Sequence, residues 1–148
     1  MELLEVLTVG LPFCAFKALV GLSLQGAAAP WRALGDALLA LGAVDLLLNL
    51  ANLAGLLARR RRVVDACLLG LAAKPLVRRP GPSWRKEDLG NSVDVLLAMS
   101  LVAYMIGAGR LGGLAPGPLA VWNVSVILNV LGAGLLRLAG SWRSLSAG

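Results

Sequence analysis

Residues 35–62 read GDALLALGAVDLLLNLANLAGLLARRRR, an apolar run of 24 residues followed directly by four arginines. As a helix the apolar run would be about 36 Å long, enough to cross the ~30 Å hydrocarbon core of a lipid bilayer. Arginines at the end of a span resist transfer across the membrane and stay on its cytoplasmic side. The stretch therefore predicts a transmembrane helix over about residues 35–58 whose C-terminal end lies in the cytoplasm.

Three further apolar runs have a similar length, at about residues 6–24, 92–109 and 118–136. Apolar residues make up 58% of the 148-residue chain, and its mean hydropathy is +0.80. The runs lack the alternation of barrel strands, so helices are the structure that satisfies their backbone groups within lipid. The sequence predicts an all-α fold: an integral membrane bundle of four transmembrane helices, formed by residues 1–148 as a single membrane domain.

The basic residues are concentrated in two parts of the chain. Eleven of the fourteen lie in the segment 59–90 or in the tail after residue 136, whereas the connections 25–34 and 110–117 carry one arginine each. The positive-inside rule makes 59–90 a cytoplasmic loop and, by counting spans outward, places both termini in the cytoplasm. We expect the cytoplasmic (inner) membrane of a bacterium, because much Ala, Gly, Leu and Arg with little Lys is typical of a GC-rich genome.

The first apolar run has a second interpretation as a cleaved signal peptide, because Ala27, Ala28 and Ala29 after it resemble a signal-peptidase site. Two features argue against cleavage. The residues before the run include Glu2 and Glu5 and no basic residue, and Lys17 would lie within the apolar region of the signal. We therefore interpret the run as a retained helix.

Within the basic loop, residues 63–73 form a short apolar stretch, VVDACLLGLAA. As a helix it would be about 16 Å long, too short to span a bilayer. It is predicted either to lie in the cytoplasmic interface or to pack under the bundle. In the interfacial interpretation the preceding arginines bind anionic lipid headgroups; these are Arg59, Arg60, Arg61 and Arg62.

Charged residues within the predicted spans are the most informative residues of the chain. An aspartate or lysine at the centre of a transmembrane helix costs ~2.5–3.5 kcal/mol, so each needs a partner or a function. Lys17 and Asp45 lie near the middle of the first two spans, at matching depths if the helices are antiparallel neighbours. They are predicted to form an intramembrane ion pair or, together with Asp94 of the third span, a coupling site for a proton or cation.

Uncharged polar residues extend this pattern into a predicted polar seam through the bundle. Asp45, Asn49 and Asn52 recur at helical spacing and share one face, and Ser125 and Asn129 do so in the fourth span. Counting depth along straight spans predicts a hydrogen bond from Asn52 to Asp94 and places Arg137 within reach of Asp94. Pro12 is predicted to free a backbone carbonyl one turn earlier and to kink the first span.

Several chemistries are disfavoured by what the sequence lacks. The chain has no histidine and no recognisable nucleophile, phosphate-binding or metal-binding motif, so no enzymatic activity, metal or cofactor is predicted. Cys14 and Cys67 lie at different expected depths, which argues against a disulfide. The net charge of +6 is explained by the cytoplasmic loop and predicts no nucleic-acid partner.

Two functions remain open at this point. The first is a small non-enzymatic accessory or structural subunit that associates through its helix faces with itself or with a larger membrane complex. The second is a compact oligomeric transporter coupled to protons or cations through its membrane carboxylates. In length and helix number the chain resembles the small multidrug transporters, but its first span carries Lys17 where a membrane carboxylate would be expected.

Overall fold

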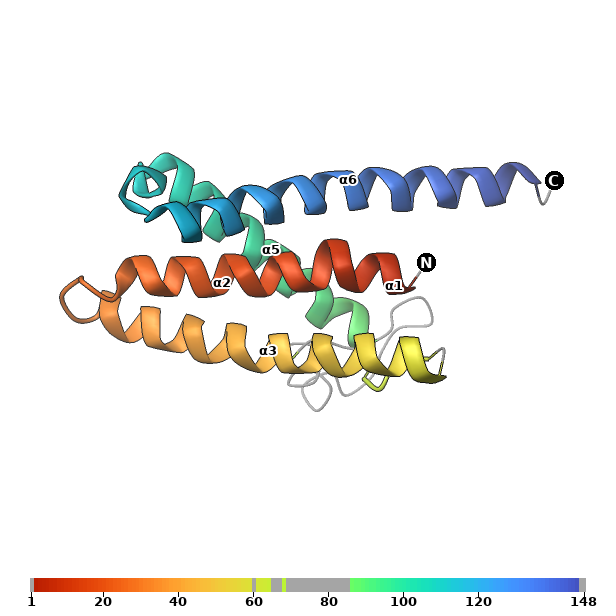
Figure 1. Cartoon of the computed structure of the whole chain (residues 1–148), viewed down its shortest axis with the longest axis horizontal. Helices are drawn as coiled ribbons and strands as arrows, with labels where there is room; N and C mark the ends of the chain where they lie inside the picture. Colours follow the sequence, from red (N-terminus) through yellow and green to blue (C-terminus); the bar gives the residue numbers. More distant parts are fainter. Residues whose placement is uncertain (1, 60, 65–67, 69–85, 147–148) are drawn as a thin grey trace.

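The computed structural model describes residues 2–59, 61–64, 68 and 86–146 (Figure 1). The elements in these ranges are all helical: α1 (Glu2–Glu5), a π-helical turn η1 (Val6–Gly10), α2 (Leu11–Leu24), α3 (Trp31–Arg59), α5 (Lys86–Gly107), a 3-10 turn η2 (Arg110–Gly113) and α6 (Pro116–Ser146). Within the described residues, three stretches are long and apolar enough to cross a membrane: Glu2–Leu24, Trp31–Ala58 and Pro116–Ala139. The predicted all-α class is confirmed, and the three long apolar stretches are compatible with a membrane protein.

The third predicted span is a helix, but its apolar part is shorter than expected. It covers Ser92–Gly107, about 24 Å of helix, and so falls short of a bilayer crossing by length alone. The helix ends where Gly109 adopts φ +64°, a left-handed conformation that favours glycine, and η2 follows. The backbone therefore leaves the helical path two residues before the end of the apolar run in the sequence.

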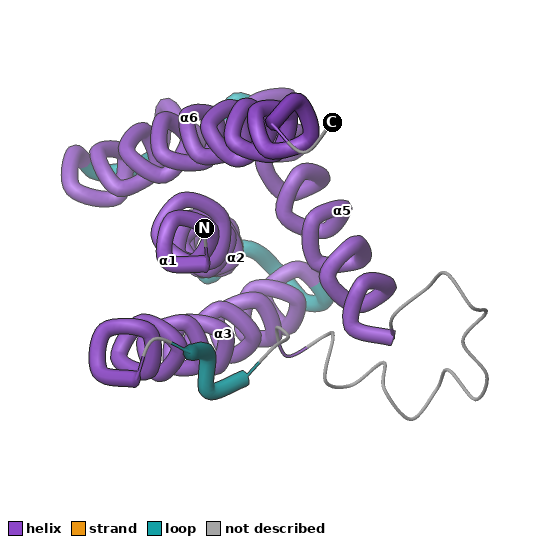
Figure 2. The backbone as a smooth tube through the Cα atoms, turned by 90° about the vertical axis from the view of Figure 1, so that its right-hand side faces the viewer, coloured by secondary structure: helices purple, strands orange, loops and turns teal. Residues whose placement is uncertain are grey.

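The central position in the bundle belongs to α2. Figure 2 shows α6, α2 and α3 side by side in one layer, with α5 running obliquely along one side of that layer. α2 contacts α3, α5 and α6, and its buried residues cover most of its circumference, leaving one side with Leu22 exposed. A polar side chain on α2 is therefore enclosed by three other helices.

Both ends of the described chain lie at the same end of the bundle (Figure 1). α3 finishes there at Arg59 and α5 starts there at Lys86, so the basic connection joins two helices at that end. The side of a membrane that this end would face stays a prediction. The predicted interfacial helix at 63–73 falls mainly on 65–67 and 69–73, which lie outside the described residues.

The first span contains a wide turn one residue before its proline. In η1 the Leu11 N–H donates to Val6 O, five residues earlier in place of the four of an α-helix, and Pro12 follows. Pro12 cannot donate to Thr8 O, the carbonyl four residues earlier, and Asn129 Nδ2 of α6 donates to that oxygen at 3.3 Å. The freed carbonyl expected from the sequence is thus bound by a neighbouring helix.

Glycine allows close approach at two helix contacts. A Cβ at Gly132 of α6 would lie 2.1 Å from Thr8 Cβ, so only glycine lets α6 pack onto η1. A Cβ at Gly21 of α2 would lie 2.8 Å from Gly35 O of α3. Short distances between helix backbones are the usual basis of helix association within membranes.

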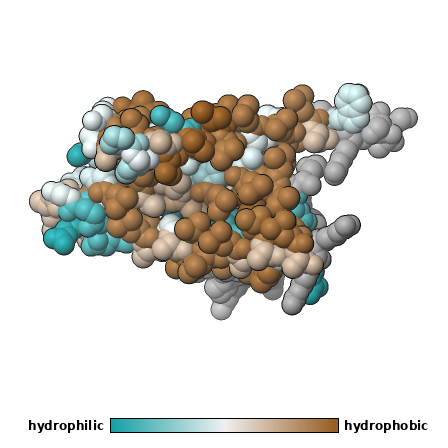
Figure 3. Space-filling model, in the orientation of Figure 1, coloured by the Kyte–Doolittle hydropathy of each residue, from teal (hydrophilic) through white to brown (hydrophobic). Residues whose placement is uncertain are grey.

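An apolar core fills the end of the bundle near the α2–α3 turn. Phe16 of α2 lies against Trp122 of α6 with ring centroids 5.1 Å apart, and buried side chains surround this pair: Phe13, Leu19, Val20, Leu24, Leu38, Ala98 and Met105. The outer surface carries exposed large apolar side chains, and Figure 3 shows one face that is mostly hydrophobic, with hydrophilic atoms gathered beside the α2–α3 turn. Such a surface is suited to lipid.

Candidate functional site: a buried ion cluster and its cavity

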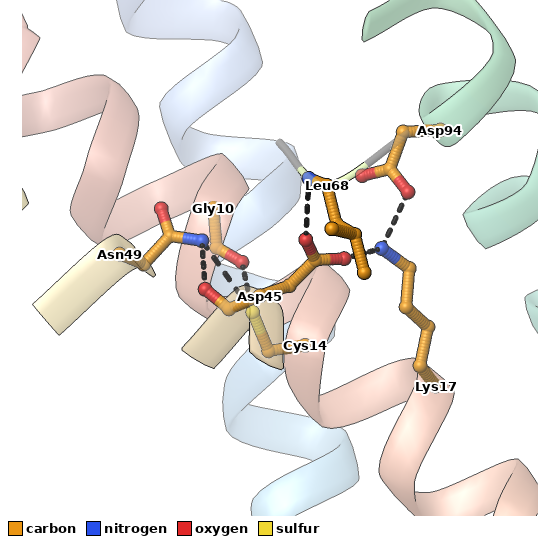
Figure 4. Close-up of polar contacts among 7 residues, drawn as sticks. All are labelled: Gly10, Cys14, Lys17, Asp45, Asn49, Leu68 and Asp94. Atoms are coloured by element: carbon orange, nitrogen blue, oxygen red, sulfur yellow. Dashed lines mark hydrogen bonds and ion pairs between the residues drawn. The ribbon is translucent and has the colours of Figure 1, made fainter. Parts of the chain in front are cut away.

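Lys17 lies between two carboxylates from two other helices (Figure 4). Its Nζ donates to Asp45 Oδ2 of α3 at 2.5 Å and to Asp94 Oδ1 of α5. The side chain of Lys17 is 0% exposed, and those of Asp45 and Asp94 are 2% and 9% exposed. We call these three residues the ion cluster; it joins α2, α3 and α5 at one point.

The two carboxylates differ in how fully they are bonded. Asp45 Oδ1 accepts the backbone N–H of Leu68 at 2.8 Å, so both of its oxygens have a donor. Asp94 Oδ2 has no donor among the described residues. With one ammonium and two carboxylates the ion cluster carries one negative charge in excess when both acids are ionised, and among the described residues it is Asp94 that has an oxygen without a donor.

A second set of polar contacts lies beside the ion cluster, toward the termini. Asn49 Nδ2 donates to Asp45 O at 2.9 Å and lies 3.5 Å from Cys14 Sγ, whose thiol donates to Gly10 O (Figure 4). A Cβ at Gly10 would lie 2.1 Å from Asn49 Oδ1, so glycine leaves room for this amide. The expected polar face of α3 therefore points into the bundle, against α2.

A cavity of about 150 Å³ connects the ion cluster to the end of the bundle that holds the termini. Lys17, Asp45 and Asp94 line its buried part, Asn49, Asn52 and Cys14 line its middle, and Glu5 and Arg62 line its outer part. Apolar side chains such as Val9, Phe13 and Leu48 complete the lining, and a cavity of this size has room for several water molecules. The cavity reaches the ion cluster, although the three side chains of the cluster are themselves only 0–9% exposed.

The segment after α3 folds back over this cavity. Asn52 Oδ1 accepts the backbone N–H groups of Val63 and Val64 at 3.0 and 2.8 Å, and Asn52 Nδ2 donates to Val64 O at 2.9 Å. Further along, Leu68 reaches Asp45, which is seven residues deeper along α3 than Asn52. The backbone of Leu68 therefore lies inside the bundle, at the ion cluster, and not in a membrane–water interface.

An ion pair lies at the outer part of the cavity. Arg62 Nη2 donates to Glu5 Oε2 at 2.5 Å, and Arg62 Nε lies 3.7 Å from Glu2 Oε2. The Glu5 side chain is 50% exposed, whereas that of Arg62 is 19% exposed. This contact ties the segment after α3 to the start of the first span.

The structure brings some of the sequence-predicted residues together and separates others. Lys17, Asp45 and Asp94 meet, Ser125 is buried and Asn129 binds Thr8 O. Two predicted contacts of Asp94 are not formed. Asn52 binds the backbone of Val63 and Val64 instead. Arg137 is exposed on α6, and the cation that pairs with Asp94 is Lys17.

Sequence reasoning missed Glu5, Arg62 and the backbone of Leu68 as parts of the site. Glu2 and Glu5 before an apolar run, in a chain whose loops are basic, were the available signal for an ion pair with a loop arginine. No signal in the sequence indicates that Leu68 N–H binds Asp45. Within the described residues no group of three or more metal-ligating side chains of the His, Cys, Asp and Glu types is found.

Comparison with protein-family models, with curated proteins and with solved structures finds no match to this chain.

Proposed function

We propose that this chain is a compact membrane carrier in which the ion cluster binds and releases one proton, coupling that step to movement of a solute. The observation that carries the proposal is the cavity that leads from the exposed Glu5 to the buried Lys17, Asp45 and Asp94. A purely structural ion pair needs no path to water, whereas a coupling site does. Assembly of the carrier into an oligomer is part of the same proposal.

The excess carboxylate supports this function. One carboxylate balances Lys17, and a second one beside it leaves a negative charge that a proton can neutralise. Asp45 is fixed by Lys17 and by Leu68 N–H, so Asp94, which receives only the Lys17 donor within the described residues, is the acceptor we propose. Asp45 would then act as the constant counter-ion of Lys17.

The membrane setting is part of the proposal. The three long helices and the shorter α5 would form four crossings, α5 with local thinning of the bilayer or with part of its polar start inserted. The shared end that holds the termini, Arg59 and the start of α5 would face the cytoplasm of a bacterial inner membrane, where loop arginines lie near anionic headgroups. The cavity would open on that side.

The test is an infrared titration of the purified chain in lipid nanodiscs. We expect a protonated-carboxyl band from a buried acid to appear on going from alkaline to acidic buffer, and Asp94→Asn to remove it. Asp36→Asn is the matched control, because Asp36 is exposed beside Gln25 at the other end of the bundle. Asp36→Asn should leave the band unchanged.

Proton flux into vesicles driven by a membrane potential is the second measurement. Wild type should conduct protons or exchange them for solute, and Asp94→Asn should reduce this flux to background while Asp36→Asn does not. A wild-type protein without a titrating buried carboxyl would contradict proton binding. A titrating band without flux under any solute gradient would contradict the carrier.

A second candidate function is a non-enzymatic accessory subunit of a larger membrane complex. It is favoured by one observation: Lys17 binds one oxygen of each acid, so the ion cluster holds three helices together. In that case Asp94→Asn would change neither flux nor titration. Co-purification of the chain with other proteins at fixed stoichiometry in mild detergent would then identify the complex.

A further inference from the structure

One polar side chain on the outer surface of α6 has no place in the site described above. Asn123 is exposed, seven residues into α6, which puts it about 10 Å along the helix from Pro116. Its neighbour Trp122 is buried against Phe16, so the next residue is directed away from α2. Asn123 would therefore face hydrocarbon if α6 crosses a membrane.

An asparagine in this position is unfavourable without a partner. Its side-chain amide has two N–H donors and a carbonyl acceptor, and none of them has a partner among the described residues. Ser100, an exposed serine of α5, differs because a serine hydroxyl can bond the carbonyl of its own preceding helical turn. Leaving an amide unpaired in an apolar medium is strongly unfavourable, because the hydrogen bonds that it made with water are not replaced.

Asn123 belongs to a regular row of exposed residues. The row, which we call the α6 outer stripe, consists of Ala120, Asn123, Ile127, Val130 and Gly134. Successive spacings of three and four residues give the 3.5-residue period at which two helices pack along their length. Ile127 and Val130 are 57% and 66% exposed, and a Cβ at Gly134 would meet nothing within 4 Å. The stripe is open along its whole length.

We propose that the α6 outer stripe is the contact surface for a second copy of this chain, with the two Asn123 side chains hydrogen-bonded to each other. Copies inserted in the same orientation have parallel α6 helices, so a two-fold axis normal to the membrane places both Asn123 residues at the same depth. An amide that donates and accepts is complementary to itself, unlike a charged side chain. The inference rests on α6 crossing the membrane and not on proton uptake.

Cysteine cross-linking in membranes tests the geometry directly. Ile127→Cys lies on the stripe, and Leu128→Cys is its matched control, since the adjacent residue is also exposed but is turned about 100° around the helix. With Cys67 replaced by serine and the buried Cys14 retained, oxidation should produce a disulfide dimer from Ile127→Cys and not from Leu128→Cys. Equal cross-linking at both positions, or none at Ile127→Cys, would overturn the proposal.

The role of the amide is tested by energy transfer between labelled copies in vesicles. Asn123→Leu should weaken association about 3- to 30-fold, the range expected for a hydrogen bond between membrane helices, while Asn123→Gln should largely keep it. Unchanged association of Asn123→Leu would overturn the amide pairing. A cross-linked product of Ile127→Cys with a different protein would overturn the second copy as the occupant of the stripe.

Discussion

The two halves of the bundle are built on different principles. The half near the α2–α3 turn, which we call the dry half, is a contiguous apolar core around Phe16 and Trp122. The half near the termini, the polar half, contains Lys17, two aspartates, two asparagines and a cavity. Lipid is as apolar as the dry core, so that core gains stability only from packing, whereas the polar half depends on each charge finding its partner. Substitutions in the two halves should therefore differ in effect.

The largest effect is expected where a buried charge loses its partner. Lys17→Met leaves Asp45 and Asp94 facing each other without a cation, which should lower the free energy of unfolding by about 3–5 kcal/mol. The measurement is unfolding in mixed micelles with increasing dodecyl sulfate. Because both acids contact Lys17, the triple variant Lys17→Met, Asp45→Leu, Asp94→Leu should recover most of the loss. A single variant as stable as wild type would show that the ion cluster contributes little to the polar half.

An intermediate effect is expected in the dry half. Phe16→Ala creates a cavity beside Trp122, and the packing loss alone should lower the free energy of unfolding by about 2 kcal/mol. The matched control is Leu47→Ala on α3, whose side chain is 67% exposed and would contact lipid in either form. The same unfolding assay measures both. A loss for Leu47→Ala as large as for Phe16→Ala would contradict the view that only packing counts in the dry half.

The smallest effect on stability, with a distinct effect on access, is expected at the outer part of the cavity. Glu5→Gln removes the charge that holds Arg62, and for so exposed a pair the free energy of unfolding should fall by less than about 1 kcal/mol. The rate at which a small thiol reagent modifies Cys14, measured by mass spectrometry, should nevertheless rise several-fold because the mouth of the cavity opens.

Asp36→Asn, at the other end of the bundle, should leave this rate unchanged. An equal modification rate in wild type and in Glu5→Gln would mean that the contact between Arg62 and Glu5 does not limit entry to the polar half.

The helices were predictable from the sequence because long apolar runs leave few alternatives in lipid. The positions of Lys17 and Asp45 could also be matched by depth, since α2 and α3 are antiparallel neighbours. The grouping of Asp94 with Lys17 and Asp45 agrees with the structure, but its two other expected partners, Asn52 and Arg137, do not, because depth was counted along a helix assumed to be perpendicular to the membrane. α5 is oblique to the other helices (Figure 2), so its residues do not lie at the depths that such counting gives.

The return of the chain after α3 was the least predictable feature of the site. Loop arginines are expected in water, and the sequence does not show that Arg62 turns back to Glu5 or that Asn52 binds the backbone at Val63 and Val64. The contact between Asn129 and Thr8 O could not be predicted from the sequence either. Pro12 identifies the free carbonyl, but which helix supplies the donor depends on packing between residues far apart in the sequence.

The wide turn at Val6–Gly10 determines in which directions the side chains before and after it point around the axis of the first span. With one residue more than an α-helical turn, it rotates the residues before it by about 100° relative to those after it. Glu2 and Glu5 can therefore face Arg62 while Lys17, on the same continuous helical rod, faces Asp45 and Asp94. Replacing that wide turn with an ordinary α-helical turn would rotate the mouth of the cavity by about 100° against its floor without altering a single residue of either.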